Sequence, residues 1–221
     1  MAETEIKNKV LKGLFWKILE NGGAQGIQFV IAIILARLLS PAEYGLVSII
    51  MIFITIANVV VQNGFSTALV QKKHSDDADF SSVFYFSLVI AGVMYAALYA
   101  SAPSIAGFYH NDVLVPIVRV LAVVLFPGAV ISVQTAYVSR KMEFKGLFKA
   151  TMAAVVISGA ASIFMAYRGM GVWAMVGQQI AYYLALMTTL FLTVSWKPRL
   201  VFAMGRISAM FSFGWKLLLA A

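Results

Sequence analysis

Six long apolar stretches, separated by short charged or turn-forming segments, dominate the chain. None alternates apolar and polar residues as the ~10-residue strand of a membrane β-barrel does. Each is about as long as the ~20 residues that a helix needs to cross a bilayer. The pattern therefore predicts an all-α, polytopic membrane protein with spans at about Leu14–Leu38, Tyr44–Leu69, Phe80–Ser101, Val113–Ser139, Ala150–Tyr167 and Val172–Trp196.

The segment before the first span has its own pattern. Ile6, Val10 and Leu14 recur every fourth position, which predicts an amphipathic interfacial helix over residues 1–13. A basic start before an apolar run is also typical of a secretory signal peptide. Gln25 and Gln28 interrupt the run, however, and more apolar spans follow it, so we favour an interfacial segment leading into a six-helix lobe over 14–196.

The C-terminal part differs from the rest. Residues 197–210 carry three basic residues and predict a cytoplasmic linker. Residues 211–221 form an apolar run that would cover about 16 Å as a helix, roughly half a bilayer. We interpret this run as the truncated start of a seventh helix. Trp215-Lys216 echoes Trp16-Lys17 of the first span, as in transporters built from parallel repeats.

Basic residues concentrate on one side of the predicted membrane. The N-terminal segment, the even-numbered loops and the C-terminal linker hold 13 of the 17 Lys and Arg residues, whereas the odd-numbered loops hold Arg37 and Arg168. Cytoplasmic loops carry an excess of Lys and Arg. The N-terminus is therefore predicted to be cytoplasmic.

Composition supports this class. The chain is 62% hydrophobic and 12% charged, against about 25% charged residues in an average soluble domain. It has no Cys and no phosphate-binding glycine loop. His74 and the acids at 76, 77 and 79 match no metal motif, and acids favour a helix N-terminus. We expect no enzyme activity, cofactor or metal, and attribute the net charge of +8 to cytoplasmic loops rather than nucleic-acid binding.

Two helix starts carry capping signals. Ser40, Pro41 and Glu43 predict a capping box and a proline in the first turn of the second span. Asp112 is the expected cap of the fourth span, which Pro127 is expected to kink.

Polar residues lie in stripes along the first two spans. Lys17, Asn21, Gln25 and Gln28 fall within about 80° of one another on a helix, as do Thr55, Asn58, Gln62 and Ser66. Gly22 and Gly26 predict a close helix contact on another face of the first span, and Glu20 lies where it can pair with Lys17. Two interpretations stay open for the stripes, hydrogen bonds between helices or a polar path for a ligand.

Further polar side chains occur in later spans. Arg119 fits either snorkelling or an internal pair, or contact with an anionic substrate, and Gln134 follows it in the same span. In the sixth span Gln178 and Tyr182 are one turn apart, as are Gln179 and Tyr183. Those tyrosines fit interhelical packing or stacking on sugar rings.

Several segments of the sequence resemble a known family, the bacterial polysaccharide transporters of the multidrug/oligosaccharidyl-lipid/polysaccharide flippase superfamily. It is most similar to the lipopolysaccharide, colanic-acid or teichuronic-acid exporter branch. The resemblance is carried, in family order, by ARLLSPAEYG (Ala36–Gly45), VQTAYVSRKMEFKGL (Val133–Leu147), GMGVWAMVGQQI (Gly169–Ile180), WKPRLVF (Trp196–Phe202) and FSFGWKLL (Phe211–Leu218).

The resemblance implies two six-helix lobes around a central cavity, with alternating access between the leaflets of the bacterial inner membrane. The chain would supply the N-terminal lobe, and its partners would be membrane phospholipids, a missing C-terminal lobe and a polyprenyl-pyrophosphate-linked oligosaccharide. Such a substrate needs a polar, preferably cationic path. Substrate contacts are expected at Lys17, Asn21, Gln25, Gln28, Asn58, Gln62, Arg119, Gln134 and Gln178.

Three rival functions are open to the sequence. A multidrug or ion-coupled exporter of cationic drugs would be expected to carry embedded acids, and the spans hold Glu20 alone. A membrane polymerase or glycosyltransferase would need acidic or metal-binding residues in a large outer loop, whereas the odd-numbered loops are short. A non-transporting accessory protein is the third.

Overall fold

The structure is a computed structural model that describes residues 2–71 and 76–201. The predicted seventh-helix segment and most of the linker lie outside the described residues. The described part is helical, with the elements α1 Ala2–Leu38, α2 Pro41–Gln71, α3 Asp77–Phe108, α4 Leu114–Leu121, the 3₁₀ turn η1 Ala122–Val124, α5 Leu125–Lys141, α6 Phe144–Tyr167 and α7 Val172–Thr193.

Within residues 2–71 and 76–201, six helical segments are long and apolar enough to cross a membrane, which confirms the predicted all-α class and the six predicted spans. The fourth span comprises α4, η1 and α5 together. One helix, α1, covers both the segment expected at the interface and the first span. The remaining differences are at helix ends: α3 continues to Phe108, α6 begins at Phe144, and α7 ends at Thr193 because Val194 is extended.

The break in the fourth span has a local cause. Pro127 has no backbone N–H, so the carbonyl of Val123, one turn earlier, has no helical donor. The chain tightens into the 3₁₀ turn η1 at this point and then resumes as α5. The regular α-helix is therefore interrupted just before Pro127, near the position of the predicted kink.

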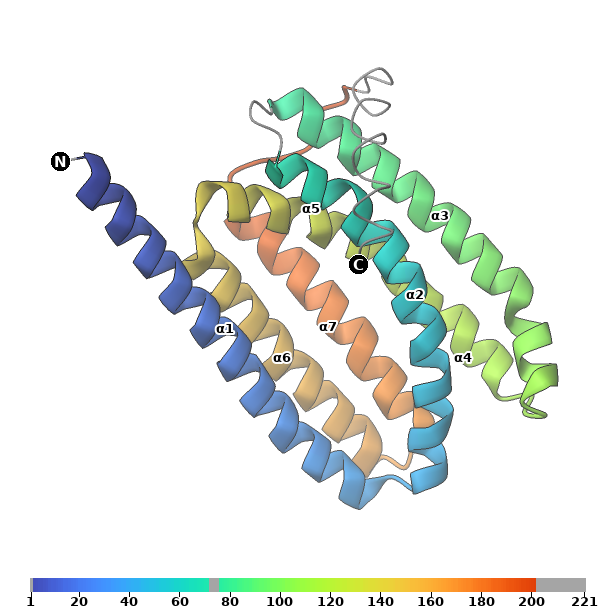
Figure 1. Ribbon diagram of the computed structural model, residues 1–221. Coiled ribbons are helices and arrows are strands. Elements are labelled where there is room, and N and C mark those ends of the chain that lie inside the picture. The colour runs from blue at the N-terminus through green and yellow to red at the C-terminus, as the bar shows by residue number, and fades with distance from the viewer. Residues whose placement is uncertain (1, 72–75, 202–221) are drawn as a thin grey trace.

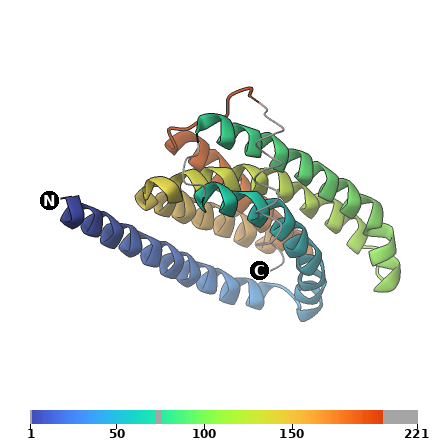
Figure 2. The ribbon, with the colours of Figure 1, turned by 45° about the horizontal axis from the view of Figure 1, so that its top comes forward.

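The helices form two groups that meet at the fourth span and α7. On one side α1 packs on α6, and α6 packs on α7; on the other, α2 and α3 pack on α4 and α5. Figure 1 shows α1 and α2 joined at their short turn and splaying apart, and Figure 2 keeps α1 apart from α2 in a second view. The α1–α2 pair touches little beyond the turn, where the Tyr44 hydroxyl donates to the Ala32 carbonyl at 3.3 Å.

Of the two expected helix caps, one is confirmed. The Ser40 Oγ accepts from the Glu43 N–H, and the Glu43 carboxylate accepts from the Ser40 N–H at 2.7 Å, which confirms the capping box. Asp76 and Asp79 form a second capping box at the start of α3. The expected Asp112 cap of α4 is wrong: the helix starts one residue later, with Val113 at the N-cap position and no side-chain cap, and the Asn111 Oδ1 accepts from the Val113 N–H at 3.1 Å.

The glycines at the close contact of α1 are not the ones that the sequence predicted. A Cβ at Gly22 or Gly26 would meet nothing within 4 Å among the described residues, so the predicted small-residue contact is wrong for this part of the protein. The close approach is made by Gly23, against Met152 of α6, and by Gly159 of α6, where a Cβ would overlap Ile31. The stripe that faces α6 is therefore the Glu20–Gly23–Ile31 side of α1.

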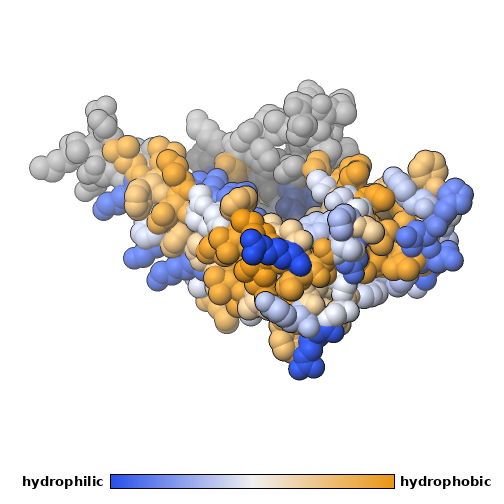
Figure 3. Space-filling model, turned by 90° about the horizontal axis from the view of Figure 1, so that it is seen from below, coloured by the Kyte–Doolittle hydropathy of each residue, from blue (hydrophilic) through white to orange (hydrophobic). Residues whose placement is uncertain are grey.

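The surface fits a lipid environment. Large apolar side chains such as Ile18, Phe29 and Leu192 are exposed on the described helices. Figure 3 shows apolar groups over much of the visible end of the molecule, with separate hydrophilic groups among them. Helices with apolar side chains both inside and outside are typical of a bundle surrounded by hydrocarbon.

Candidate functional site

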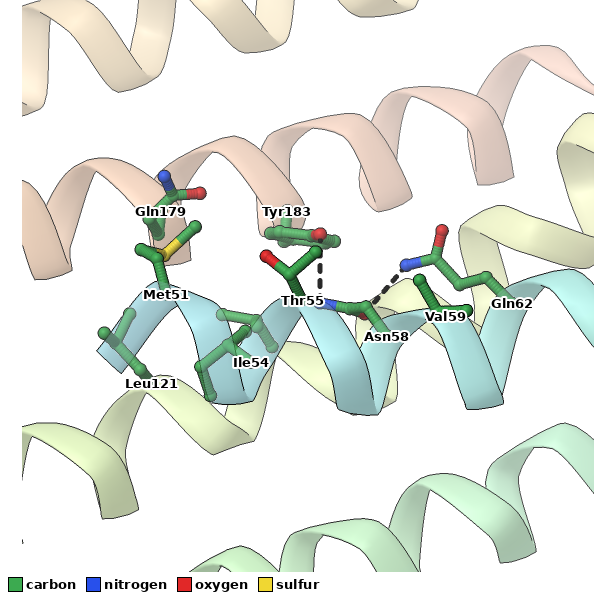
Figure 4. Close-up of a pocket in the computed structure, with 10 residues that line it drawn as sticks. Met51, Ile54, Thr55, Asn58, Val59, Gln62, Leu121, Gln179 and Tyr183 are labelled. Atoms are coloured by element: carbon green, nitrogen blue, oxygen red, sulfur yellow. Dashed lines mark hydrogen bonds between the residues drawn. The ribbon is translucent and has the colours of Figure 1, made fainter. Parts of the chain in front are cut away.

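The polar stripe of α2 faces α7 across a small cavity of about 160 Å³. The Asn58 amide donates to the Tyr183 hydroxyl at 3.3 Å, and the Gln62 amide donates to the Asn58 carbonyl oxygen at 2.8 Å. Figure 4 shows these side chains with Thr55 and Gln179 around the cavity. Ser66 has no described side chain. The polar side chains of two helices distant in sequence therefore meet in one site.

A glycine of α5 packs against the amides that line this cavity. A Cβ at Gly128 would lie 3.0 Å from both the Asn58 Oδ1 and the Gln62 Nε2, closer than ordinary van der Waals contact. The Ser132 hydroxyl, one turn further along α5, donates to the Gln62 carbonyl at 3.1 Å. The resumption of the helix after Pro127 thus places a bare backbone against the amides.

A second cavity, of about 320 Å³, lies on the α1 side of α7. Gln28 of α1 lines it together with Gln178 and Gln179 of α7. Its remaining lining residues are Ala32, Ser158 and Tyr182. Gln179 lines both cavities, so we refer to the two together as the Gln179 cleft.

The rest of the α1 stripe lies outside this lining. Asn21 and Gln25 are exposed and make no hydrogen bond to a described residue. Lys17 donates to the Glu20 carboxylate at 2.9 Å, which confirms the expected pair. The Thr151 hydroxyl of α6 donates to the other Glu20 oxygen at 3.1 Å. Lys17 and Glu20 therefore neutralise each other at the α1–α6 contact.

The two other predicted residues are elsewhere in the fold. Gln134 is fully buried in α5, and neither its amide nitrogen nor its oxygen has a partner among the described residues. Arg119 lies in a separate groove between α3, α4 and α7. The structure thus brings together Gln28, Asn58, Gln62 and Gln178 of the predicted site, and does not place Lys17, Asn21, Gln25, Arg119 or Gln134 in the same lining.

Gln179 and Tyr183 line the cavity and Gly128 packs against its amides, although none of the three was among the substrate contacts expected from the sequence. A signal for the first two was present, since Gln179 and Tyr183 repeat the one-turn spacing of Gln178 and Tyr182. Nothing local marks Gly128, whose role arises from the approach of α2.

The cleft chemistry is neutral and hydrogen-bonding. Its described lining consists of amides, hydroxyls and apolar groups, with no acidic or basic side chain. Amides offer both donors and acceptors, so such a lining suits a ligand rich in hydroxyl groups. It offers no nucleophile paired with a base, as covalent catalysis would require.

Fold and cleft together define a multi-pass helical membrane protein with polar cavities where its first two spans face α7. Comparison with known proteins then gives the family. Residues 34–221 match the family described as polysaccharide biosynthesis protein. The chain belongs to this family. No solved structure gives a significant match.

Curated relatives carry related names. The succinoglycan biosynthesis transport protein ExoT of Rhizobium meliloti is 26% identical over 216 residues, covering 97% of this chain and 44% of the relative. The teichuronic acid biosynthesis protein TuaB of Bacillus subtilis is 27% identical, covering 95% and 44%. The lipopolysaccharide biosynthesis protein WzxC of Escherichia coli is 20% identical over 53% of this chain. The chain thus spans less than half the length of these relatives.

Proposed function

We propose that the chain forms one lobe of a transporter that moves a lipid-linked oligosaccharide across the bacterial inner membrane during polysaccharide biosynthesis. A second helical lobe would complete the path. Two of the relatives are named for transport or lipopolysaccharide biosynthesis, and the chain covers 44% of the ExoT length, which fits one lobe of two.

The observation that carries the proposal is the convergence of amides on Gln179. Gln28, Asn58 and Gln62 come from two diverging helices and line cavities that share one residue of α7, Gln179. If the polar side chains of α1 served only to bond neighbouring helices, its amides would make hydrogen bonds to another helix. Gln28 makes no such bond among the described residues. The unused hydrogen-bonding capacity of the cleft favours a ligand.

The ligand class follows from the lining. A sugar hydroxyl pairs with an amide without any charge, and the rings of Tyr182 and Tyr183 at the cleft offer surfaces for the apolar face of a sugar. A cationic drug would find no carboxylate in the described lining. The proposal therefore assigns the oligosaccharide to the Gln179 cleft.

Complementation tests this assignment. The whole gene, carrying Asn58→Leu or Gln62→Leu, is expressed in a strain that lacks its own transporter of this family. Leucine keeps the size and removes the hydrogen bonds, so surface polysaccharide should fall several-fold while the lipid-linked precursor accumulates. Gly128→Ala should act in the same direction, because its Cβ would press on both amides.

Matched controls separate the cleft from general damage. Gly92→Ala makes the same change in α3, where a Cβ meets nothing within 4 Å, and Ser48→Ala removes an exposed hydroxyl of α2 that bonds only its own helix. Both should export normally, and immunoblots should show equal abundance. Normal surface polysaccharide in both leucine variants would refute the proposal.

A further inference from the structure

Arg119 lies in a groove of about 650 Å³ that shares no lining residue with the Gln179 cleft. The groove runs between α3, the fourth span and α7. Its lining residues are Tyr95, Tyr99, Val115, Pro116, Arg119, Val120, Val123 and Ile180.

The groove faces away from the cleft. In α4 the buried residues Leu114, Ile117 and Leu121 form one face of the helix. Arg119 is about 200° around the helix from Leu121, and Leu121 lines the cavity beside α2. No residue of α1 or α2 lines the groove. The groove therefore opens on the outer side of the lobe, where a membrane protein meets lipid.

The Arg119 guanidinium is held but not neutralised. Its central carbon lies 4.1 Å from the centroid of the Tyr99 ring, a cation–π contact that uses one face of the planar group. Its Nε is buried and has no hydrogen-bond partner among the described residues, and Arg119 forms no ion pair with a described acid. The N–H donors point along the plane of the group, so they stay available to an anion beside it.

An apolar part of the groove lies deeper along the fourth span than Arg119. Val120, Val123 and Ile180 line it, and Val123 is 44% exposed. At the nearby helix ends Phe108 and Tyr109 are exposed. Exposed aromatic side chains of this kind are typical of the membrane interface. Arg119 is about 8 Å from the start of α4, a depth from which its long side chain reaches the headgroup region.

We propose that this groove binds a glycerophospholipid with a net negative headgroup, as a site distinct from the proposed transport cleft. The phosphodiester oxygens accept from the in-plane N–H groups of Arg119, while an acyl chain lies along Val120 and Val123. A headgroup such as phosphatidylglycerol is favoured because the described lining supplies one cation and no carboxylate. The choline group of phosphatidylcholine would instead meet the positive charge of Arg119.

Native mass spectrometry of the delipidated product of the whole gene tests the site. Titration with phosphatidylglycerol should give adducts that persist at lower lipid concentration than those of phosphatidylcholine. Arg119→Ala should weaken phosphatidylglycerol binding about tenfold, the loss expected for one charge-assisted hydrogen bond. Arg119→Lys should be intermediate, because an ammonium cannot reproduce the planar fork.

Two further variants make the test specific. Val123→Trp fills the acyl part of the groove and should lower phosphatidylglycerol binding with Arg119 intact. Arg168→Ala is the matched control: Arg168 also lies over an aromatic ring, that of Phe164 at 5.0 Å, but it is exposed, and its removal should leave lipid binding unchanged.

Several outcomes would overturn the inference. Equal binding of phosphatidylglycerol by the unmodified protein and by both the Arg119→Ala and Val123→Trp variants would remove the site. Equal affinity for phosphatidylcholine would refute the anionic headgroup, and displacement of the lipid by millimolar inorganic phosphate would make this a soluble-anion site. Because export is measured separately, failure here leaves the proposed transport function untouched.

Discussion

At the scale of single residues, the charged groups inside the spans divide between packing and binding. Glu20 is a carboxylate with 8% of its side chain exposed, and it receives bonds from Lys17 and Thr151. A buried carboxylate without partners would be costly in hydrocarbon. Lys17 therefore has a structural task at the α1–α6 contact, whereas Arg119 has no acid to neutralise.

Lys17→Met tests that division. It leaves the Glu20 carboxylate with Thr151 alone, and we expect the free energy of unfolding to fall by about 1–3 kcal/mol, the usual cost of stranding a buried polar group. The double variant Lys17→Met/Glu20→Gln should recover most of this loss, because a neutral amide still accepts from Thr151. Thermal unfolding in detergent measures both.

The export assay distinguishes this structural role of Lys17 from a role in substrate binding. If Lys17 contacts substrate, as the sequence predicted, the double variant will fold normally and still fail to export. Normal export by the double variant would assign Lys17 to packing alone.

At the scale of helices, their existence was predictable and their contact faces were not. Hydropathy is a local property, so the six spans and the break before Pro127 follow from the sequence. Which face of α1 becomes buried depends on the helix that packs against it. That helix is α6, which follows α1 by more than 100 residues in the sequence. Gly22 and Gly26 have the right spacing for a contact but lie on the open face, while Gly23 lies against Met152.

The α1–α6 contact yields a prediction of its own. A Cβ at Gly159 would overlap the Ile31 side chain, so Gly159→Ala should destabilise the protein by about 1–3 kcal/mol, as overpacking of a core does. Ile31→Ala removes the overlapping atoms. The double variant should therefore lose less stability than the two single variants lose together. Thermal unfolding of the unmodified protein, the two single variants and the double variant measures this coupling.

A control fixes the interpretation of this cycle. Gly26→Ala places the same methyl group on the open face of α1, where nothing lies within 4 Å. It should leave the unfolding temperature unchanged or raise it slightly, because alanine favours a helix over glycine. Strict additivity of Gly159→Ala and Ile31→Ala would contradict the close approach.

At the scale of the whole molecule, the cleft depends on the divergence of α1 and α2. The sequence predicted two polar stripes on helices joined by a tight turn, but not which helix each stripe faces. In the structure α7 lies between them, and each stripe meets it separately. The same arrangement turns Arg119 toward the opposite face. Such relations depend on helix order in space, which local patterns do not contain.

The orientation of the helical bundle in the membrane can also be tested. Figure 1 places the N-terminal end of α1 and the α5–α6 connection toward one end of the bundle, and the α3–α4 connection toward the other. The basic residues predict that the first end is cytoplasmic. In spheroplasts a cysteine at Glu143, exposed between α5 and α6, should therefore react with an impermeant maleimide only after permeabilisation, and one at Asp112, exposed before α4, should react without it. These 221 residues contain no cysteine, so within them only the introduced residue reacts. Reversed labelling would invert the topology and place the Arg119 groove in the inner leaflet.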